Sequence, residues 1–234
     1  MHVVTFDRVS RSYPSGEVRI PALDDVSFAI QQGTFTALVG PSGSGKTTAL
    51  NLIGCLDRPS QGTVTVAGQD VSALDRTAGA AFRGEKLGFV FQDFNLLPVL
   101  SVFENVEYPL LMIRNQPKAA RRAEVLRVLA AVEMLDQAAK YPAQLSGGQK
   151  QRVAVARALV GGPVLVLADE PTANLDGHTA HKVMELMKQM RDEFGTTFVF
   201  STHDPRIMDQ AEMTIHLEDG RLTGEETSAQ EARS

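Results

Sequence analysis

The chain has 234 residues, 43% of them hydrophobic, and a formal net charge of −5 from 23 Lys and Arg against 28 Asp and Glu. Its length suits one large α/β domain, or a core with an inserted subdomain, and allows a sizeable buried core. The mildly acidic balance gives no electrostatic footprint for a nucleic acid, so we expect no such partner. The lone Cys55 cannot form an intrachain disulfide, and we expect a small buried residue in a reducing compartment.

Apolar segments rich in β-branched residues predict strands in chain order, at residues 3–9, 22–30, 34–39, 63–66, 87–91, 164–168, 197–200 and 214–217. The turn-prone residues 13–16 separate the first two strands, which we expect to be antiparallel. Residues 72–83 predict a loop and a weak helix, and Asp219-Gly220 predicts a hairpin turn. Residues 1–5 lack the basic and then apolar pattern of a signal peptide. No apolar run approaches the roughly 20 residues that span a bilayer, so another chain is expected to cross any membrane that the protein serves.

Residues 93–161 have helical periodicity with hardly a strand among them. Ser101 and Glu104 fit a capping box at the start of one helix, and residues 118–135 predict an amphipathic second helix. A further amphipathic helix is expected at residues 180–194. We therefore predict one domain over residues 1–223, with a sheet core at 1–92 and 162–223, a helical subdomain at 93–161, and a disordered tail at 224–234.

One glycine-rich stretch between a predicted strand and a predicted helix fits the phosphate-loop pattern G-x-x-x-x-G-K-[ST] in full. Its residues are Gly40, Pro41, Ser42, Gly43, Ser44, Gly45, Lys46, Thr47 and Thr48. The glycines let backbone N–H groups converge on an anion, together with the free N–H groups of the following helix. Lys46 supplies a positive charge for the β- and γ-phosphates, and the Thr47 hydroxyl suits a Mg²⁺ that bridges them. The alternative is a Gly/Ser-rich connecting loop with a chance lysine.

A second candidate anion site lies at the start of the helix that ends near Val160. Ser146 is a candidate N-cap, and Gly147 and Gly148 leave the first amides uncovered by side chains. Gln149 completes this stretch. The alternative is a glycine-rich helix start chosen for turn geometry.

Three titratable residues follow predicted strands at their carboxyl ends. Asp169 suits a hold on Mg²⁺, and Glu170 suits a general base or a water-orienting group for attack on the γ-phosphorus. Their alternative is a solvated polar strand end. His203 falls on the same expected edge and is able to donate a hydrogen bond to phosphate or water, although a loop histidine without a task is the alternative.

These motifs occur in an order that resembles the nucleotide-binding subunit of an ABC transporter, over about residues 3–222. Residues 40–48 resemble the Walker A motif, Gln92 the glutamine loop, residues 145–149 the LSGGQ signature, residues 164–170 the Walker B strand with its catalytic glutamate, residues 173–176 the D-loop, and His203 the switch histidine. Ala173 stands where the D-loop more usually has Ser. The resemblance implies a phosphate-loop ABC-ATPase fold: a mixed sheet core, an N-terminal antiparallel β subdomain and an inserted helical subdomain.

The same resemblance implies how the residues act. ATP and Mg²⁺ are the expected ligands, with Lys46, Gln92, Glu170 and His203 as catalytic groups and Thr47, Gln92 and Asp169 at the metal. Tyr13 resembles the aromatic residue that stacks on adenine, although a tyrosine packed on the core is the alternative. Two copies are expected to enclose two ATP molecules head to tail, with the signature residues and Asp176 of one copy facing the nucleotide of the other.

The expected partner beyond the second copy is a transmembrane permease on a separate chain. This partner would place the protein in the cytoplasm, on the cytoplasmic face of the inner or plasma membrane. Residues 94–100 are a candidate surface for that permease, with core packing as the alternative. Residues 91–98 and 104–106, with the last helix of the insert, resemble the lipoprotein-release and macrolide-efflux type, so a lipoprotein, peptide or drug is the expected cargo. A soluble ABC ATPase and a small-molecule phosphotransferase are the competing function classes.

Overall fold

A computed structural model describes residues 1–16, 18–113 and 116–227, and the chain divides into two compact units. Unit 1 comprises Met1–Arg83 and Thr197–Ser234, and unit 2 comprises Gly84–Thr196. Unit 2 is therefore larger than the helical subdomain expected at residues 93–161. The strand that contains Gly88 belongs to unit 2 because it packs closely on the helix that contains Ala158. A Cβ added at Gly88 would lie 2.4 Å from the carbonyl oxygen of Ala158.

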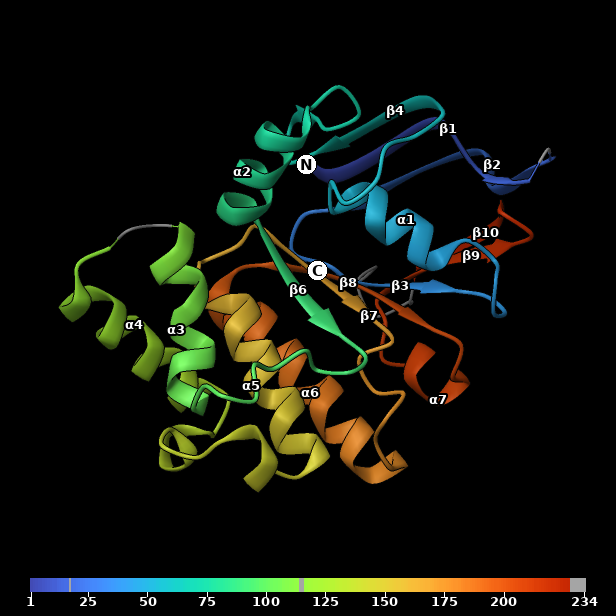
Figure 1. The fold of residues 1–234 in the computed structure, drawn as a ribbon. Helices are drawn as coiled ribbons and strands as arrows, with labels where there is room; N and C mark the ends of the chain where they lie inside the picture. Colours follow the sequence, from blue (N-terminus) through green and yellow to red (C-terminus); the bar gives the residue numbers. More distant parts are fainter. Residues whose placement is uncertain (17, 114–115, 228–234) are drawn as a thin grey trace. The chain divides into compact units, whose positions relative to one another are not determined.

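Unit 1 contains a four-stranded antiparallel sheet in the order β2-β1-β4-β5 (Figure 1). The strands are β1 (His2–Ser15), β2 (Val18–Gln31), β4 (Gln61–Val66) and β5 (Gln69–Asp70). The expected turn at residues 13–16 is wrong in part, because Tyr13 still pairs with Ile20 inside the hairpin. Stacked rings of Phe6 and Phe28, with centroids 4.3 Å apart, help to hold the two long strands together.

The other strands of unit 1 surround β3 (Phe35–Val39), all five of whose residues are buried. β3 is parallel to β8 (Thr197–Thr202) on one side and to β9 (Met213–Glu218) on the other. β10 (Arg221–Thr227) pairs with β9 through a two-residue turn in which Asp219 and Gly220 both have positive φ, as predicted. Because β10 continues through Thr227, residues 224–227 do not belong to a disordered tail. Residues 228–234 lie outside the described part of the chain.

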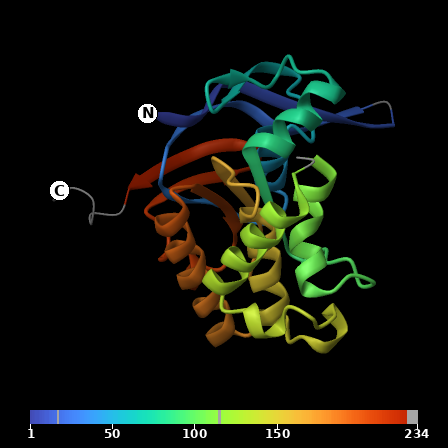
Figure 2. The same cartoon turned by 90° about the vertical axis from the view of Figure 1, so that its left-hand side faces the viewer.

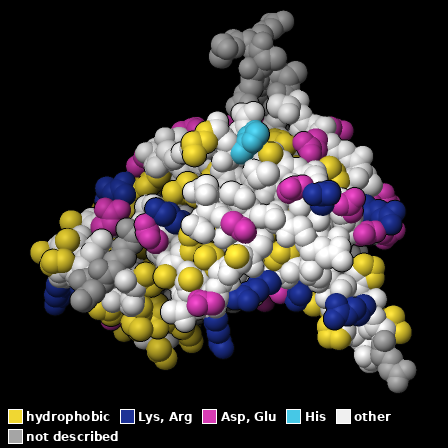
Figure 3. Space-filling model, turned by 90° about the horizontal axis from the view of Figure 1, so that it is seen from above, with side chains coloured by type: hydrophobic (Ala, Val, Ile, Leu, Met, Phe, Trp, Pro, Cys, Tyr) yellow, Lys and Arg dark blue, Asp and Glu magenta, His cyan; other side chains and the backbone are white. Residues whose placement is uncertain are grey.

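Helices α1 (Lys46–Ile53), α2 (Arg76–Lys86) and the short α7 (Pro205–Met208) complete the elements that begin in unit 1. The loop and weak helix expected over residues 72–83 are thus confirmed, except that the helix ends three residues later than expected. On the face shown in Figure 3, acidic and basic side chains are interspersed among neutral and hydrophobic ones.

Unit 2 contains the parallel pair β6 (Leu87–Phe91) and β7 (Leu165–Asp169), in register from Leu87 opposite Leu165 to Phe91 opposite Asp169. Its helices are α3 (Val102–Ile113), α4 (Lys118–Ala131), α5 (Gly147–Leu159) and α6 (Gly177–Phe194), with 3₁₀ turns η1 (Leu135–Gln137) and η2 (Pro142–Gln144). Figures 1 and 2 show α5 beside α3 and α6, and its apolar residues are buried there. α5 is thus the central helix of unit 2.

The helix ends of unit 2 follow the predicted signals. The backbone N–H of Glu104 donates to Ser101 Oγ (3.3 Å) and the Ser101 N–H donates to Glu104 Oε2 (2.7 Å), which confirms the capping box. The Ser101 hydroxyl also donates to Glu104 Oε2 (2.7 Å), and this hydrogen bond, with that from the Ser101 N–H, lowers the pKa of Glu104. Gly195 ends α6 in the left-handed region, with φ of 62°. Among the described residues, no helix is both long and apolar enough to cross a membrane.

Candidate functional site

The phosphate-loop pattern lies at the carboxyl end of β3, where the backbone turns into α1. Two of its glycines are required by close approach to other backbone atoms. A Cβ at Gly40 would lie 2.0 Å from the carbonyl oxygen of Leu217, and one at Gly45 would lie 2.5 Å from that of Ala22. Gly43 has φ of +82° and open space beside it. The loop is thus a compact turn that leads from β3 into the start of α1, which fits a phosphate-binding loop.

Lys46 is the first residue of α1, and its side chain folds along the loop. Its ammonium donates to the carbonyl oxygens of Gly40 (2.7 Å) and Pro41 (2.8 Å), and the residue is only 6% exposed. Ser44 is also buried, and its backbone N–H donates to the Pro41 oxygen (3.2 Å). The positive charge is therefore held beside the backbone N–H groups at the start of α1, where an anion is favoured.

His203 lies beside the phosphate loop within unit 1. Val39 and Thr202 are opposite one another at the ends of parallel β3 and β8, so Gly40 and His203 leave the sheet at the same edge. The His203 side chain is exposed. Its neighbour Asp204 accepts hydrogen bonds from Arg206, which lower the pKa of Asp204. The sequence-based placement of His203 at this edge is thereby confirmed, while its role stays a prediction.

In unit 2, Gln92, Asp169 and Glu170 lie at the carboxyl ends of two adjacent parallel strands. Because Phe91 pairs with Asp169 at the ends of parallel β6 and β7, Gln92 and Glu170 are the first residues beyond adjacent strand ends. Glu170 has φ of 44°, in the left-handed region that a non-glycine residue seldom adopts. Such backbone conformations cluster at functional sites, where surrounding contacts hold them. Asp169 and Glu170 are both half-buried.

The candidate anion site at the start of α5 is an ordered capping box. The Gln149 N–H donates to Ser146 Oγ (3.3 Å), and the Ser146 N–H donates to Gln149 Oε1 (3.0 Å). The Ser-x-x-Gln spacing is the sequence signal for this reciprocal cap. The prediction from the sequence includes only Ser146 as the N-cap. A Cβ at Gly147 would lie 3.1 Å from Leu175 Cδ2, and one at Gly148 would lie 2.5 Å from Thr179 Cγ2. Close packing on the chain around the start of α6 therefore gives these two glycines a structural reason as well.

The D-loop stretch, residues 173–176, leads into α6. Asp176 is the N-cap of that helix and accepts from the Thr179 N–H (3.0 Å). Hydrogen bonding from the Thr179 side chain, and next from its N–H, lowers the pKa of Asp176. The Asn174 side chain instead contacts the chain after β6, since its Nδ2 donates to the carbonyl oxygen of Gln92 and to Asp93 Oδ1. Sequence reasoning missed this contact, and the partners are 81 and 82 residues apart, so no local signal marks it.

Tyr13 is half-buried in β1, and its hydroxyl donates to Asp57 Oδ2 (2.7 Å). The Arg11 guanidinium lies over the Tyr13 ring, 4.6 Å from its centroid, and also forms an ion pair with Asp57 (2.7 Å). A purine is therefore able to stack only on the ring face away from Arg11. Stacking on adenine stays a prediction.

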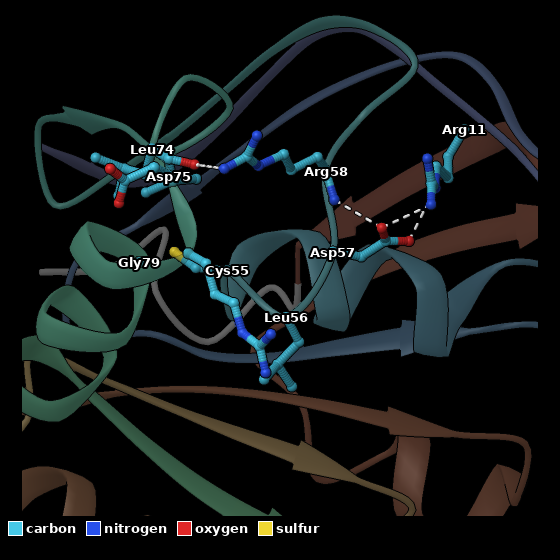
Figure 4. A pocket seen from close by; sticks show the side chains of 10 residues that line it. Arg11, Cys55, Leu56, Asp57, Arg58, Leu74, Asp75 and Gly79 are labelled. Carbon is cyan, nitrogen blue, oxygen red and sulfur yellow. Dashed lines mark hydrogen bonds and ion pairs between the residues drawn. The ribbon is translucent and has the colours of Figure 1, made fainter.

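A cavity of about 400 Å³ lies beside this cluster, between the chain after α1 and the start of α2 (Figure 4). The Arg58 guanidinium donates to the Leu74 carbonyl oxygen, and the Arg58 N–H donates to Asp57 Oδ1, so Arg58 and Asp57 both have hydrogen-bond partners within the lining. Cys55 is half-buried at the cavity, and this burial raises the pKa of its thiol.

Residues 23–173 match a family profile described as "ABC transporter". The chain belongs to the ABC transporter family. It is 43% identical to a solved structure described as a dimeric post-hydrolysis state of the ATP-binding cassette MJ0796 bound to ADP and Pi, with a TM-score of 0.86 and coverage of 96% of this chain and 98% of that one. The fold predicted from the motifs, that of an ABC ATPase cassette, is confirmed.

Two curated relatives place the chain within the family. It is 45% identical over 216 residues to the lipoprotein-releasing system ATP-binding protein LolD of Bordetella pertussis, covering 92% of this chain and 93% of that protein. It is 48% identical over 216 residues to the macrolide export ATP-binding/permease protein MacB of Salmonella typhi, covering 92% of this chain. The match takes in 33% of that MacB, so the chain spans about a third of the length of this relative. The predicted resemblance to the lipoprotein-release and macrolide-efflux type is confirmed.

Proposed function

We propose that this chain is the ATP-binding and ATP-hydrolysing subunit of an ABC transporter of the LolD and MacB type. The observation that carries the proposal is the glycine loop at the carboxyl end of β3, whose Gly40 and Gly45 have no room for a side chain and whose Lys46 ammonium lies along it. The loop's backbone N–H groups bind the phosphates, and Lys46 binds the β- and γ-phosphate oxygens. The related cassette bound to ADP and Pi supports this assignment.

Residues beyond the loop are proposed to act on the terminal phosphate. Glu170 orients or deprotonates the attacking water, and His203 donates a hydrogen bond to the phosphate or to that water. Thr47, Gln92 and Asp169 would hold Mg²⁺, because oxygen donors are the ligands this cation prefers. When bound with ATP, Mg²⁺ neutralises charge that develops on the phosphate oxygens.

We infer that two copies of the chain act together. The dimeric structure described for MJ0796, which is 43% identical with a TM-score of 0.87, supports this inference. In our proposal, Ser146, Gly147, Gly148, Gln149 and Asp176 of one copy face the ATP held by the phosphate loop of the other. Donors supplied in trans make hydrolysis conditional on closure, with a rate factor of roughly 10³ to 10⁵ by analogy with arginine fingers.

The proposed partner is a transmembrane permease, and the proposed cargo is a lipoprotein, a peptide or a drug-like molecule. The names of the relatives, a lipoprotein-releasing system and a macrolide export protein, support these classes. The chain would then sit on the cytoplasmic face of the membrane. Leu97 is 39% exposed and Val99 is 79% exposed, so residues 94–100 offer apolar side chains to such a partner.

The test replaces Glu170 by Gln, which keeps the size of the side chain and removes its carboxylate. We expect the variant to bind ATP, to accumulate as an ATP-bound dimer on size-exclusion chromatography, and to turn over little. Hydrolysis at the wild-type rate would remove Glu170 from the mechanism. A pull-down from detergent extract is expected to recover a multi-span membrane protein, and recovery only with ribosomes or nucleic acid would contradict the transporter assignment.

A further inference from the structure

The chain that follows β6 crosses unit 2 without regular structure, and side chains from distant elements hold its backbone. Asn105 of α3 is 1% exposed and donates to the carbonyl oxygens of Leu97, Leu100 and Ser101. Arg157 of α5 donates to the carbonyl oxygen of Phe94 (2.8 Å) and to that of Asn95 (2.5 Å). These side-chain donors bind the backbone of a segment that pairs with no strand. The Ser101 oxygen also accepts from the Asn105 N–H (2.9 Å), in the first hydrogen bond of α3.

Asn174 holds the first two residues of the same segment. Its Nδ2 donates to the carbonyl oxygen of Gln92 (3.1 Å) and to Asp93 Oδ1 (2.9 Å). Both partners are acceptors, so the amide nitrogen of Asn174, and not its oxygen, must face them. Both N–H bonds of the carboxamide are used, and the one to the Asp93 carboxylate is the stronger kind.

A short hydrogen-bonded stretch of backbone also connects Asn174 to Glu170. Only three residues separate the two, and the backbone between them is closed by hydrogen bonds from the Ala173 N–H to the Glu170 oxygen (3.2 Å) and from the Leu175 N–H to the Thr172 oxygen (3.1 Å). Glu170 itself has φ of 44°. A conformation of this kind persists only where the surroundings hold it. The turn that starts at Glu170 and the turn that starts at Gln92 therefore meet at one carboxamide.

The far end of the Gln92 turn is anchored independently. Phe94 and Asn95 have φ of 61° and 48°, two consecutive non-glycine residues in the left-handed region, and the Arg157 guanidinium binds both of their carbonyl oxygens. Burial lowers the pKa of Arg157. With this end fixed to α5, a displacement of Gln92 must change the contact between Asp93 and Asn174.

We propose that Asn174 is a positioning residue for hydrolysis: its carboxamide couples the backbone at Gln92 to the turn that sets Glu170. The proposal rests on the function proposed above, in which Gln92 and Glu170 both serve the terminal phosphate. Asn174 touches neither nucleotide nor water in this account. It acts by keeping the Glu170 side chain in its working orientation whenever the Gln92 segment is in place.

The first test compares steady-state ATPase kinetics of the full chain. Asn174→Ala is expected to lower kcat about tenfold, which corresponds to about 1.4 kcal/mol of activation free energy. The KM for ATP is expected to stay within twofold, because in the proposal Asn174 serves the chemical step and does not bind ATP. Gln189→Ala is the matched control, since Gln189 is an exposed amide on α6, and it should leave both parameters unchanged.

The second test exchanges the two partners and separates positioning from a loss of stability. Asn174→Asp places two carboxylates 2.9 Å apart and removes both donated hydrogen bonds, so kcat should fall more than in Asn174→Ala. Asp93→Asn alone keeps an acceptor and should have a small effect. In the double variant, the new amide at position 93 donates to the new carboxylate at position 174, and kcat should recover at least fivefold over Asn174→Asp.

The outcomes distinguish this proposal from the proposed function. A wild-type chain without ATPase activity, or a Glu170→Gln variant with full activity, would overturn the proposed function itself. An active wild type with Asn174→Ala within twofold of its kcat would overturn the role of Asn174 alone. The same conclusion follows if the double variant is no faster than Asn174→Asp, or if Asn174→Ala raises KM while kcat is unchanged.

Discussion

Replacing Gly148 by Ala tests why the start of α5 carries glycine. The added Cβ would lie 2.5 Å from Thr179 Cγ2, whereas carbon atoms in contact prefer about 3.5 to 4.0 Å. Relieving an overlap of more than 1 Å costs about 1 to 3 kcal/mol, and the better helix propensity of alanine returns at most about 1 kcal/mol. We therefore expect a net loss of about 1 to 2 kcal/mol, seen as a fall in Tm of roughly 3 to 6 °C for a chain of this size.

Thr179→Ser supplies the decisive background, because it removes the Cγ2 methyl group and keeps the backbone N–H that Asp176 caps. In that background Gly148→Ala should change Tm by less than about 1 °C or raise it slightly. Thermal unfolding of the wild type, the two single variants and the double variant measures the coupling between positions 148 and 179. An equal penalty for Gly148→Ala in both backgrounds would refute the steric argument and leave an unobstructed backbone N–H as the reason for the glycine.

The remaining predictions concern three other sites. Gly45→Ala should abolish binding of a fluorescent ATP analogue, because its Cβ would lie 2.5 Å from the Ala22 carbonyl oxygen and φ there is +104°; binding within twofold of wild type would contradict this. Cys55 should react with iodoacetamide several-fold more slowly in the folded than in the urea-unfolded chain, since burial raises its pKa and leaves less thiolate; equal rates would remove that explanation. The pKa of Asp176 is lowered in the folded state, so its contribution to stability is present above the unfolded value of about 3.9 and is lost as pH falls through the folded pKa. Asp176→Asn keeps an acceptor that does not titrate, and its urea midpoint should therefore fall less than that of the wild type between about pH 5 and pH 2.

The sequence predicted those parts of the fold and site whose determinants lie close together in the chain. The strand that feeds Gly40, the capping box at Ser101 and the turn at Asp219 each follow from a few consecutive residues, and the structure confirms all three. The burial of strand residues 35–39 fits a segment that is apolar except at Thr36. Boundaries were less predictable, as the hairpin shows, because β1 and β2 extend past Tyr13 through pairing that no local signal encodes.

Contacts across the chain were beyond this kind of prediction. The bond between Asn174 and Gln92 spans 82 residues, and that between Arg157 and Asn95 spans 62. Polar residues in loops ordinarily face water, so their sequence gives no reason to pair them. The hydroxyl of Tyr13 likewise finds Asp57, 44 residues away, once β1 lies beside the chain that follows α1. Such pairings arise only when the strand order is known.

The two glycine-rich segments differ in the kind of atom that a Cβ added at each glycine would approach. This difference predicts which segment a second substitution is able to rescue. At Gly40 and Gly45 the nearest obstacle is a carbonyl oxygen of another strand or loop, at 2.0 and 2.5 Å, which no substitution of a side chain removes. At Gly148 the obstacle is the methyl group of Thr179, which Ser lacks. The backbone of the phosphate loop is thus fixed by the fold of unit 1, while the start of α5 is shaped by side chains around the start of α6. A compensating substitution exists for the second segment and not for the first, so variation in the signature region should be coupled to α6.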